Sequence, residues 1–313
     1  KNTGGIVIVQ VEYLAQRGTL DPKKVQIPGI MVDYVVQATE KECCWQTEGV
    51  YYEPAFSGQI KKPLDQLPVL DLSPRKVICR RCAEELAPGS ICNLGVGIPA
   101  DVASIVAEEG QLDKITITAE AGGVGGVPAA LPNFGSNYNA QAIMRHNDMF
   151  DFIDGGGLDI TVLGLAEADS EANLNVSKFG NRLSGPGGFI DITNATPKVV
   201  FCGTFMGKAK YAVGDGKLTI LQEGTIQKFV KNVEQITFAG QYAKPSQEVL
   251  YVTERCVFQL MDGKMTLIEI APGIDLEKDV LAHMGFTPAV SPNLKTMDPA
   301  LFQETWGGLA QTL

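Results

Sequence analysis

Histidine is scarce in this sequence, with only His146 and His283 among 313 residues. A site built from clustered histidines is therefore strongly disfavoured. No apolar run approaches the roughly 20 residues that a membrane-spanning helix needs, so no membrane partner is expected. Basic residues are in the minority, 26 against 36 acidic, and the net charge is −10. This balance argues against nucleic acid or an anionic membrane as the main partner, although a glycine-rich turn can still bind a small anion.

The seven cysteines are an odd number for a disulfide framework. Several lie in apolar runs of a chain long enough to bury a core, which indicates reduced thiols and a cytoplasmic protein. Cys79 and Cys82 have metal-site spacing, and with Cys43 and Cys44 they could form a four-thiolate zinc site. Zinc ribbons hold their ligands on turns, however, and this spacing falls within a predicted helix. We therefore interpret Cys79 and Cys82 as small apolar helix residues and expect no metal.

The order of periodic segments predicts an α/β fold, an open and mostly parallel sheet with flanking helices and antiparallel edge strands. Residues 39–72 lack periodicity and are rich in proline, which predicts a linker between segments 1–38 and 73–313. Ser73 followed by Pro74 is a helix start signal, and Asp262-Gly263 indicates a hairpin. Helices are predicted over 74–86, 100–109 and 275–284, and strands over 6–11, 31–36, 90–94, 114–118, 158–165, 199–205, 217–221, 234–238, 249–254, 256–261 and 265–270.

Two glycine-rich segments carry the candidate chemistry. In the first, Gly95-x-Gly97-x-x-Ala100 follows a predicted strand and matches a dinucleotide-binding fingerprint, with Glu120 at the end of the next strand as its acid. In the second, Glu120 is followed by four glycines within Gly122–Gly126. Such a run predicts that another segment packs closely against the backbone beside the carboxylate, which a dinucleotide site does not need. A lone carboxylate suits covalent catalysis better than paired acid–base chemistry, unless Glu120 is simply a solvated residue at the end of a strand.

Together, Asn93–Pro99 and Thr118–Pro128 resemble the two signatures of family I coenzyme A transferases. Further similarity lies in Asp154–Asp159, Gly185–Ile192, Ile236–Phe238 and Tyr251–Phe258. The resemblance is strongest to the acetate/propionate branch, in which two halves are fused. It implies that residues 1–38 end the N-terminal half and residues 73–313 form the C-terminal half. Residue 1 is Lys, and a strand pattern begins almost at once, so we expect a piece of a longer polypeptide whose N-terminal half is supplied as a second chain.

The resemblance also implies a ping-pong reaction in which Glu120 attacks a short-chain acyl-CoA. An anhydride and then a glutamyl-CoA thioester form, and a second carboxylate reverses the steps. An ordinary glutamate, with a pKa of about 4.3, is already ionised at neutral pH and needs no histidine base. Oxyanion stabilisation is expected from the turn over 95–98. The expected oxyanion and CoA contacts are Gly95, Val96, Gly97, Ile98, Gly187 and Gly188, with the N–H of Gly97 or Ile98 favoured as the oxyanion donor.

Coenzyme A is a substrate in this scheme, and no cofactor is expected. The expected partners are acyl-CoA, short-chain carboxylates of the acetate/propionate class and further copies of the chain. Ala121 departs from the Ser or Thr usual in the branch, which is expected to alter the acyl pocket. Two alternatives remain open. One is an NAD-dependent dehydrogenase that uses the Gly95–Ala100 loop and Glu120, and the other is a catalytically silent half.

Overall fold

The computed structural model describes residues 1–63 and 69–313, and these form two compact units, Lys1–Pro54 and Ala55–Leu313. The boundary falls inside the segment 39–72, for which a linker is expected. Ala55 and Phe56 are buried in the second unit, where the Phe56 ring lies 4.7 Å from that of Tyr138. The predicted linker therefore divides, with its first part in one unit and its last part packed on the other.

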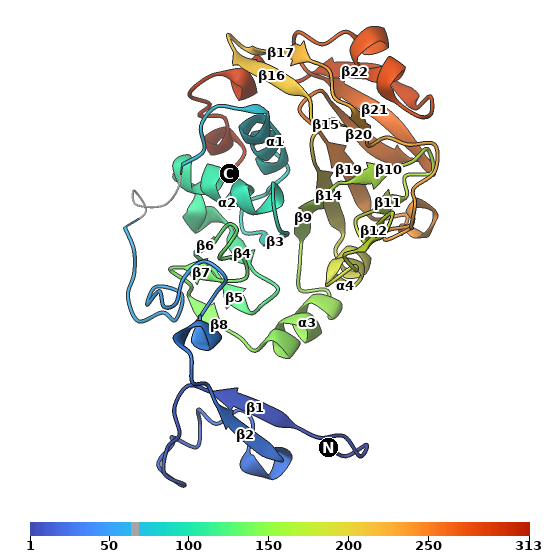
Figure 1. Cartoon of the computed structure of the whole chain (residues 1–313). Helices are drawn as coiled ribbons and strands as arrows, with labels where there is room; N and C mark the ends of the chain where they lie inside the picture. The colour runs from blue at the N-terminus through green and yellow to red at the C-terminus, as the bar shows by residue number, and fades with distance from the viewer. Residues whose placement is uncertain (64–68) are drawn as a thin grey trace. The chain divides into compact units, whose positions relative to one another are not determined.

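The first unit contains a two-stranded parallel sheet. Strand β1 (Ile8–Val11) pairs with β2 (Tyr34–Gln37), close to the positions predicted for them (Figure 1). Short 3-10 turns cover Gly29–Met31 and Lys41–Cys44. All four residues of β2 are exposed, so the apolar strands predicted here do not bury their side chains within the described residues.

A ten-stranded sheet forms the centre of the second unit in the described chain, in the order β22-β21-β20-β19-β14-β9-β3-β4-β5-β8. Its strands are β3 (Ile91–Leu94), β4 (Thr116–Thr118), β5 (Gly123–Val124), β8 (Ala142–Ile143), β9 (Ile160–Gly164), β14 (Lys198–Cys202), β19 (Glu248–Val252), β20 (Cys256–Met261), β21 (Lys264–Ile270) and β22 (Ala289–Thr296). The central strands from β19 to β4 run parallel. Antiparallel pairings flank them, and β22 runs parallel to β21. The predicted α/β class with a mostly parallel sheet is confirmed.

Five small antiparallel strand pairs lie outside this sheet in the described residues. They are β6 (Val127–Pro128) with β7 (Asn137–Tyr138), β10 (Glu167–Ala168) with β11 (Leu174–Asn175), β12 (Lys178–Phe179) with β13 (Arg182–Leu183), β15 (Met206–Gly207) with β18 (Ile226–Gln227), and β16 (Lys210–Gly214) with β17 (Lys217–Gln222) among the described residues. Several of them lie in the connections that leave the carboxyl ends of the parallel strands.

Helices cover both faces of the sheet (Figure 1). Helices α1 (Pro74–Ala83) and α2 (Val102–Glu108) pack on one face, and α3 (His146–Asp154) and α4 (Phe189–Ala195) on the other. Strand β14 shows why both faces are apolar: Val200 and Cys202 join the α1 side of the core, whereas Val199 and Phe201 join the α3 side. Strands that are covered on both faces have continuous apolar runs in their sequences.

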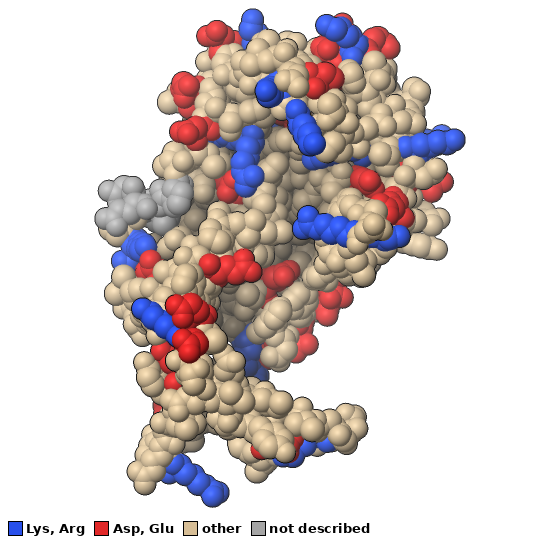
Figure 2. All heavy atoms as spheres, viewed as in Figure 1, with Lys and Arg blue, Asp and Glu red and all other residues tan. Residues whose placement is uncertain are grey.

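Helix α1 begins as predicted, with Pro74 at its first position and the Ser73 hydroxyl accepting a hydrogen bond from the Lys76 N–H at 3.3 Å. Cys79 and Cys82 are fully buried on this helix, which confirms their interpretation as apolar core residues. No helix in the described part of the chain is both long enough and apolar enough to span a membrane. Acidic and basic side chains are interspersed on the face shown in Figure 2.

Two predicted elements are wrong. Residues 234–238 form no strand, because the Thr237 hydroxyl, rather than a ladder carbonyl, accepts a hydrogen bond from the Val176 N–H, and only Phe238 bridges to Leu174. Residues 275–284 are not an α-helix but a π turn over Leu276–Val280 followed by a 3-10 turn over Leu281–His283. There the Asp279 carbonyl accepts a hydrogen bond from Arg255 at 2.7 Å instead of extending a helical ladder.

Candidate active site

Glu120 lies just beyond the carboxyl end of β4, where ligands bind in open parallel sheets. Gly95 follows the neighbouring strand β3, and Gly164 ends β9, so three strand ends converge on one place. There they border an apolar cavity of about 340 Å³. Its lining residues are Gly95–Val96, Glu120, Phe134, Leu163–Gly164, Val176, Ser184–Phe189 and Ile192. The two glycine loops and the segment 184–191, far apart in the sequence, are therefore brought together.

A second cavity of about 430 Å³ adjoins the first at shared residues, and we call it the polar cavity because more ionisable side chains line it. It is lined by Glu120, His146, Asn147, Phe150, Gly187, Gly188 and Asp191. Glu120, Gly187 and Gly188 thus line both the apolar cavity and the polar cavity. A carboxylate so placed can reach a substrate bound in either space.

Gly188 is tightly fitted against the Glu120 carboxylate. A Cβ atom at Gly188 would lie 2.7 Å from Glu120 Oε2 and 2.6 Å from Phe150 Cζ, closer than real Cβ atoms approach other groups. Its backbone φ is ordinary, so a side chain here would not be strained, but it would displace the Glu120 carboxylate or the Phe150 ring. At Gly187 the constraint is different, since its φ is +55° and nothing crowds a Cβ there.

The glycine run after Glu120 packs closely against residues 137–144, as its composition predicts. A Cβ at Gly122 would lie 2.1 Å from the Met144 carbonyl oxygen, and one at Gly126 would lie 2.0 Å from that of Tyr138. The Asn137 amide donates a hydrogen bond to the Gly125 carbonyl at 3.0 Å, which ties the two segments together. The run therefore fixes the backbone that carries Glu120.

The electrostatic setting of Glu120 differs from that of an ordinary glutamate. Burial raises its pKa, and the nearby His146 opposes that shift. The side chain is only partly buried, so the carboxylate remains accessible to a ligand. The assumption of an unshifted glutamate is thus incomplete, because a smaller fraction of Glu120 is ionised at a given pH than a fully solvated group would show.

The turn over residues 95–98 presents Val96, not Gly97 or Ile98, to the apolar cavity. The Gly95 N–H is occupied, since it donates to the Val162 carbonyl at 2.9 Å. Gly97 has a φ of +89° and turns the chain, and the Ile98 carbonyl accepts from the Cys79 thiol at 3.4 Å. The prediction of Gly97 or Ile98 as the oxyanion donor stays a prediction, and Val96 joins them as a candidate because it lines the cavity.

Two residues around Glu120, His146 and Phe150, have no signal in the sequence, whereas Asp191 lies in the family-like segment Gly185–Ile192. His146, Phe150 and Asp191 reach the polar cavity only because α3 and α4 pack together. His146 and Phe150 lie one turn apart on α3, and their rings are 5.2 Å apart. The scarcity of histidine argues against a site built from clustered histidines, but it does not exclude a single histidine near the candidate nucleophile.

The sequence of this chain is similar to the sequences of known CoA-transferases. The chain is 62% identical over 315 residues to the caffeate CoA-transferase of Acetobacterium woodii, covering 99% of this chain and 60% of that protein. It is 35% identical over 210 residues to the acetate CoA-transferase subunit beta of Escherichia coli K12, covering 64% of this chain and 86% of that subunit. The chain belongs to the family I CoA-transferases. No family model matches it.

The fold of this CoA-transferase chain matches a crystal structure of acyl-CoA transferase YdiF from Escherichia coli O157:H7, described as a thioester complex with CoA, at a TM-score of 0.85 and 40% identity. The match covers 98% of this chain and 57% of that chain. The chain therefore spans well under two thirds of the length of its single-polypeptide relatives. Membership of the family favours coenzyme A over the NAD alternative as the ligand of the glycine loops.

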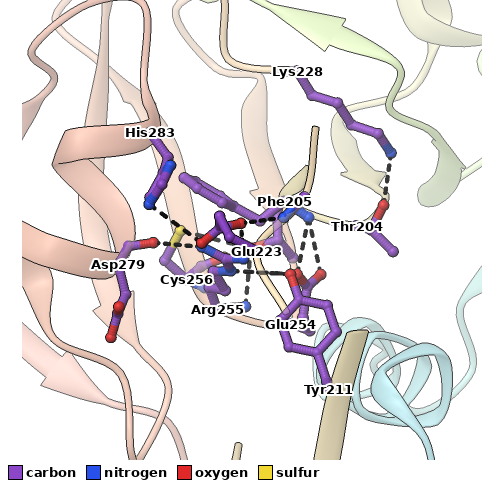
Figure 3. Close-up of polar contacts among 12 residues, drawn as sticks. Thr204, Phe205, Tyr211, Glu223, Lys228, Glu254, Arg255, Cys256, Asp279 and His283 are labelled. Atoms are coloured by element: carbon purple, nitrogen blue, oxygen red, sulfur yellow. Dashed lines mark hydrogen bonds and ion pairs between the residues drawn. The ribbon is translucent and has the colours of Figure 1, made fainter. Parts of the chain in front are cut away.

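A buried ionic cluster in this CoA-transferase chain lies at the turn after β19, within the family-like segment 251–258 (Figure 3). The Glu254 and Arg255 side chains are fully buried. Glu254 accepts a hydrogen bond from the Phe205 N–H at 2.9 Å, and Arg255 donates to both carboxylate oxygens of Glu223 at 2.6 and 3.0 Å. The cluster thereby joins the loop after β14 to the β17 strand end, and its groups line neither cavity.

Proposed function

We propose that this chain carries the catalytic glutamate of a CoA-transferase that moves coenzyme A between an acyl-CoA and a carboxylate. The observation that carries the proposal is the position of Glu120, a half-buried carboxylate shared by two cavities and held against Gly188. A carboxylate in this position is accessible to an acyl-CoA and then to an acid.

In the proposed first half-reaction, a Glu120 carboxylate oxygen attacks the acyl-CoA carbonyl and displaces the CoA thiolate, giving an acyl-glutamyl anhydride. The thiolate then attacks the glutamyl carbonyl, which releases the acyl group as a free carboxylate and leaves a glutamyl-CoA thioester. In the second half-reaction, the acceptor carboxylate attacks that thioester, and the same steps run in reverse. Charge and atoms balance without a proton donor, so no general base is required.

Both tetrahedral intermediates place negative charge on a former carbonyl oxygen. We propose the Val96 N–H as the oxyanion donor, because Val96 lines the cavity beside Glu120 while the Gly95 N–H is already bonded. One well-placed donor lowers an acyl-transfer barrier by about 3–4 kcal/mol. The segment Ser184–Phe189, which borders Glu120 on the other side, is proposed to contact coenzyme A through Gly187 and Gly188.

The acyl group has two candidate classes. Short-chain acids of the acetate/propionate class fit the resemblance found in the sequence and the name of the Escherichia coli subunit. A second candidate is an aromatic acid, favoured by the apolar cavity of about 340 Å³ with Phe134, Leu163 and Phe189 in its wall and by the name of the Acetobacterium woodii relative. Acetate would leave most of this cavity unfilled, and we therefore expect larger acids to react at least as well.

We further propose a cytoplasmic enzyme that works with an N-terminal half as a second chain and assembles with further copies of itself. All seven cysteines are unpaired, and five are buried, which fits a reducing compartment. The relatives are longer than this chain, which fits the need for a second segment.

Intact mass after mixing with acyl-CoA, without acceptor acid, tests the proposal. Acetyl-CoA and caffeoyl-CoA are compared, with the chain alone and together with the unmatched segment of the Acetobacterium woodii relative. A CoA adduct should form and map to Glu120 by peptide analysis, and Glu120→Gln should abolish it. An adduct on a cysteine, or none in either preparation, would overturn the glutamyl mechanism. The ratio of the two adduct yields decides between the acyl classes.

A further inference from the structure

The charges around Glu120 are unfavourable for an anionic substrate. Among the described residues that line the two cavities, Glu120 and Asp191 are acidic, and none is Lys or Arg. The free acid that leaves or enters in each half-reaction is an anion. Glu120 is an uncharged thioester when the acid enters or leaves, so Asp191 is the remaining acidic group. Close approach of like charges is repulsive in a partly dehydrated site, so binding of the acid calls for a positive group nearby.

His146 is the residue in this set that can carry a positive charge. It opens α3, is exposed to the polar cavity, and its ring packs 5.2 Å from that of Phe150, which limits its orientation. It lies close enough to Glu120 to hold the pKa of that carboxyl below the value that burial alone would give. An imidazole so placed can face a ligand beside Glu120.

The other charged groups around His146 are already engaged or acidic. Arg145, its neighbour in sequence, forms a two-point ion pair with Asp148 at 2.8 and 3.0 Å. Asp191 on α4 and Glu120 after β4 complete the charged groups that line the polar cavity. Neither can bind an anion.

We propose that the His146 imidazole binds the carboxylate of the free acid substrate where the polar cavity meets Glu120, beside the glutamyl-CoA thioester. This inference rests on the proposed CoA-transferase function. It leaves the acyl part of the acid in the apolar cavity, places the carboxylate at Glu120 where the polar cavity begins, and makes His146 a substrate-binding residue rather than a base.

The test measures each substrate separately, because kcat/KM in a ping-pong reaction reports the half-reaction of that substrate. In His146→Gln, kcat/KM for the acid should fall by about tenfold or more, the size of a lost hydrogen bond to a charged group. The value for acyl-CoA should change by less than about threefold. His146→Lys, which offers a cationic hydrogen-bond donor at the same position, should restore much of kcat/KM for the acid.

His283→Gln is the matched control, because His283 contacts Glu223 in the buried cluster and lines neither cavity. The His283→Gln variant should leave kcat/KM for the acid unchanged. Equal losses for both substrates in His146→Gln, or unaltered acid kinetics, would overturn the role of His146. Formation of the CoA adduct on Glu120, measured in the same variants, separates the two proposals. A missing adduct in the unaltered protein refutes the transferase function. A normal adduct together with normal acid kinetics in His146→Gln refutes only the role of His146.

Discussion

Glu120 has to be ionised to act as a nucleophile, yet its burial raises its pKa. Replacing it with glutamine keeps its shape and removes the attacking oxygen, so we expect turnover to fall by about a thousandfold or more, as for other lost nucleophiles. Glu120→Asp withdraws the carboxylate by one methylene, and a displacement of about 1 Å costs about 100-fold. Steady-state kinetics with acyl-CoA check both values, and a Gln variant with a tenth of normal turnover would contradict the assignment.

The ionised Glu120 carboxylate is needed for activity, but it should lower the free energy of unfolding. A raised folded-state pKa contributes stability that is fully present below the ordinary glutamate pKa of about 4.3 and is lost as pH rises through the folded value. At neutral pH the ionised Glu120 is therefore destabilising. Glu120→Gln should resist urea better than the unaltered protein at pH 7, and the difference should shrink towards pH 4. The exposed Glu277, changed to Gln, serves as control and should show no such pattern.

Gly188 offers a sharper geometric test. In Gly188→Ala the new methyl group would meet Glu120 Oε2 and Phe150, so the carboxylate has to move by a large part of an ångström. We expect kcat to fall by about 100-fold, in line with the sensitivity of reacting groups to misplacement. Gly214→Ala, at a hairpin position with ordinary φ and open space, should leave kcat unchanged. Normal turnover in Gly188→Ala would show that this contact does not position the nucleophile.

At the scale of elements, the glycine run after Glu120 is held by its fit against residues 137–144. Gly122→Ala combines a φ of +119° with a carbonyl oxygen 2.1 Å from the new Cβ, whereas Gly156→Ala has a φ of +84° and open space. Both changes incur backbone strain of about 1–2 kcal/mol. We expect Gly122→Ala to lower the free energy of unfolding clearly beyond this value and Gly156→Ala to stay near it. Equal losses in urea denaturation would mean that conformation alone explains the glycine run.

The elements that sequence predicts correctly have strong local signals. The hairpin at Asp262-Gly263 has φ values of +51° and +72°, the conformation that this pair favours. Asp215-Gly216, with +50° and +74°, carries the same signal and joins β16 to β17, a hairpin left unpredicted. Strand β22 was missed because Pro292 interrupts it, which an edge strand tolerates.

The site divides in the same way. Glu120, Gly95 and Gly188 lie in glycine-rich motifs whose spacing can be recognised, and all three line the apolar cavity. His146 lies on α3 and Asp191 lies on α4, and only the packing of these two helices against each other brings both residues to Glu120. No local pattern encodes that packing. The choice of oxyanion donor likewise depends on which N–H groups the neighbouring strand occupies, as the Gly95–Val162 hydrogen bond shows.

At the scale of the whole molecule, strands β1 and β2 pose a problem of burial. Ile8, Tyr34 and Val35 are 64%, 61% and 54% exposed, although they belong to a parallel pair. Parallel sheets are covered on both faces in proteins, and two strands alone are marginally stable. Each fully buried side chain of this size contributes about 1.5–3 kcal/mol. We therefore propose that these strands join a sheet formed by the segment of the longer relatives that these 313 residues do not match.

This proposal predicts how residues 1–313 behave with and without that segment. Expressed alone, the chain should aggregate through its bare strands and show little transferase activity. Co-expression with the unmatched segment of the Acetobacterium woodii relative should give a stable complex, detected by size-exclusion chromatography, and should restore turnover. Val35→Glu should weaken that complex, because it places a charge on the surface to be buried, whereas Glu277→Gln, an exposed change in the other unit, should not. A soluble and fully active 1–313 chain would contradict the proposal, since the bare strands would then need no further cover.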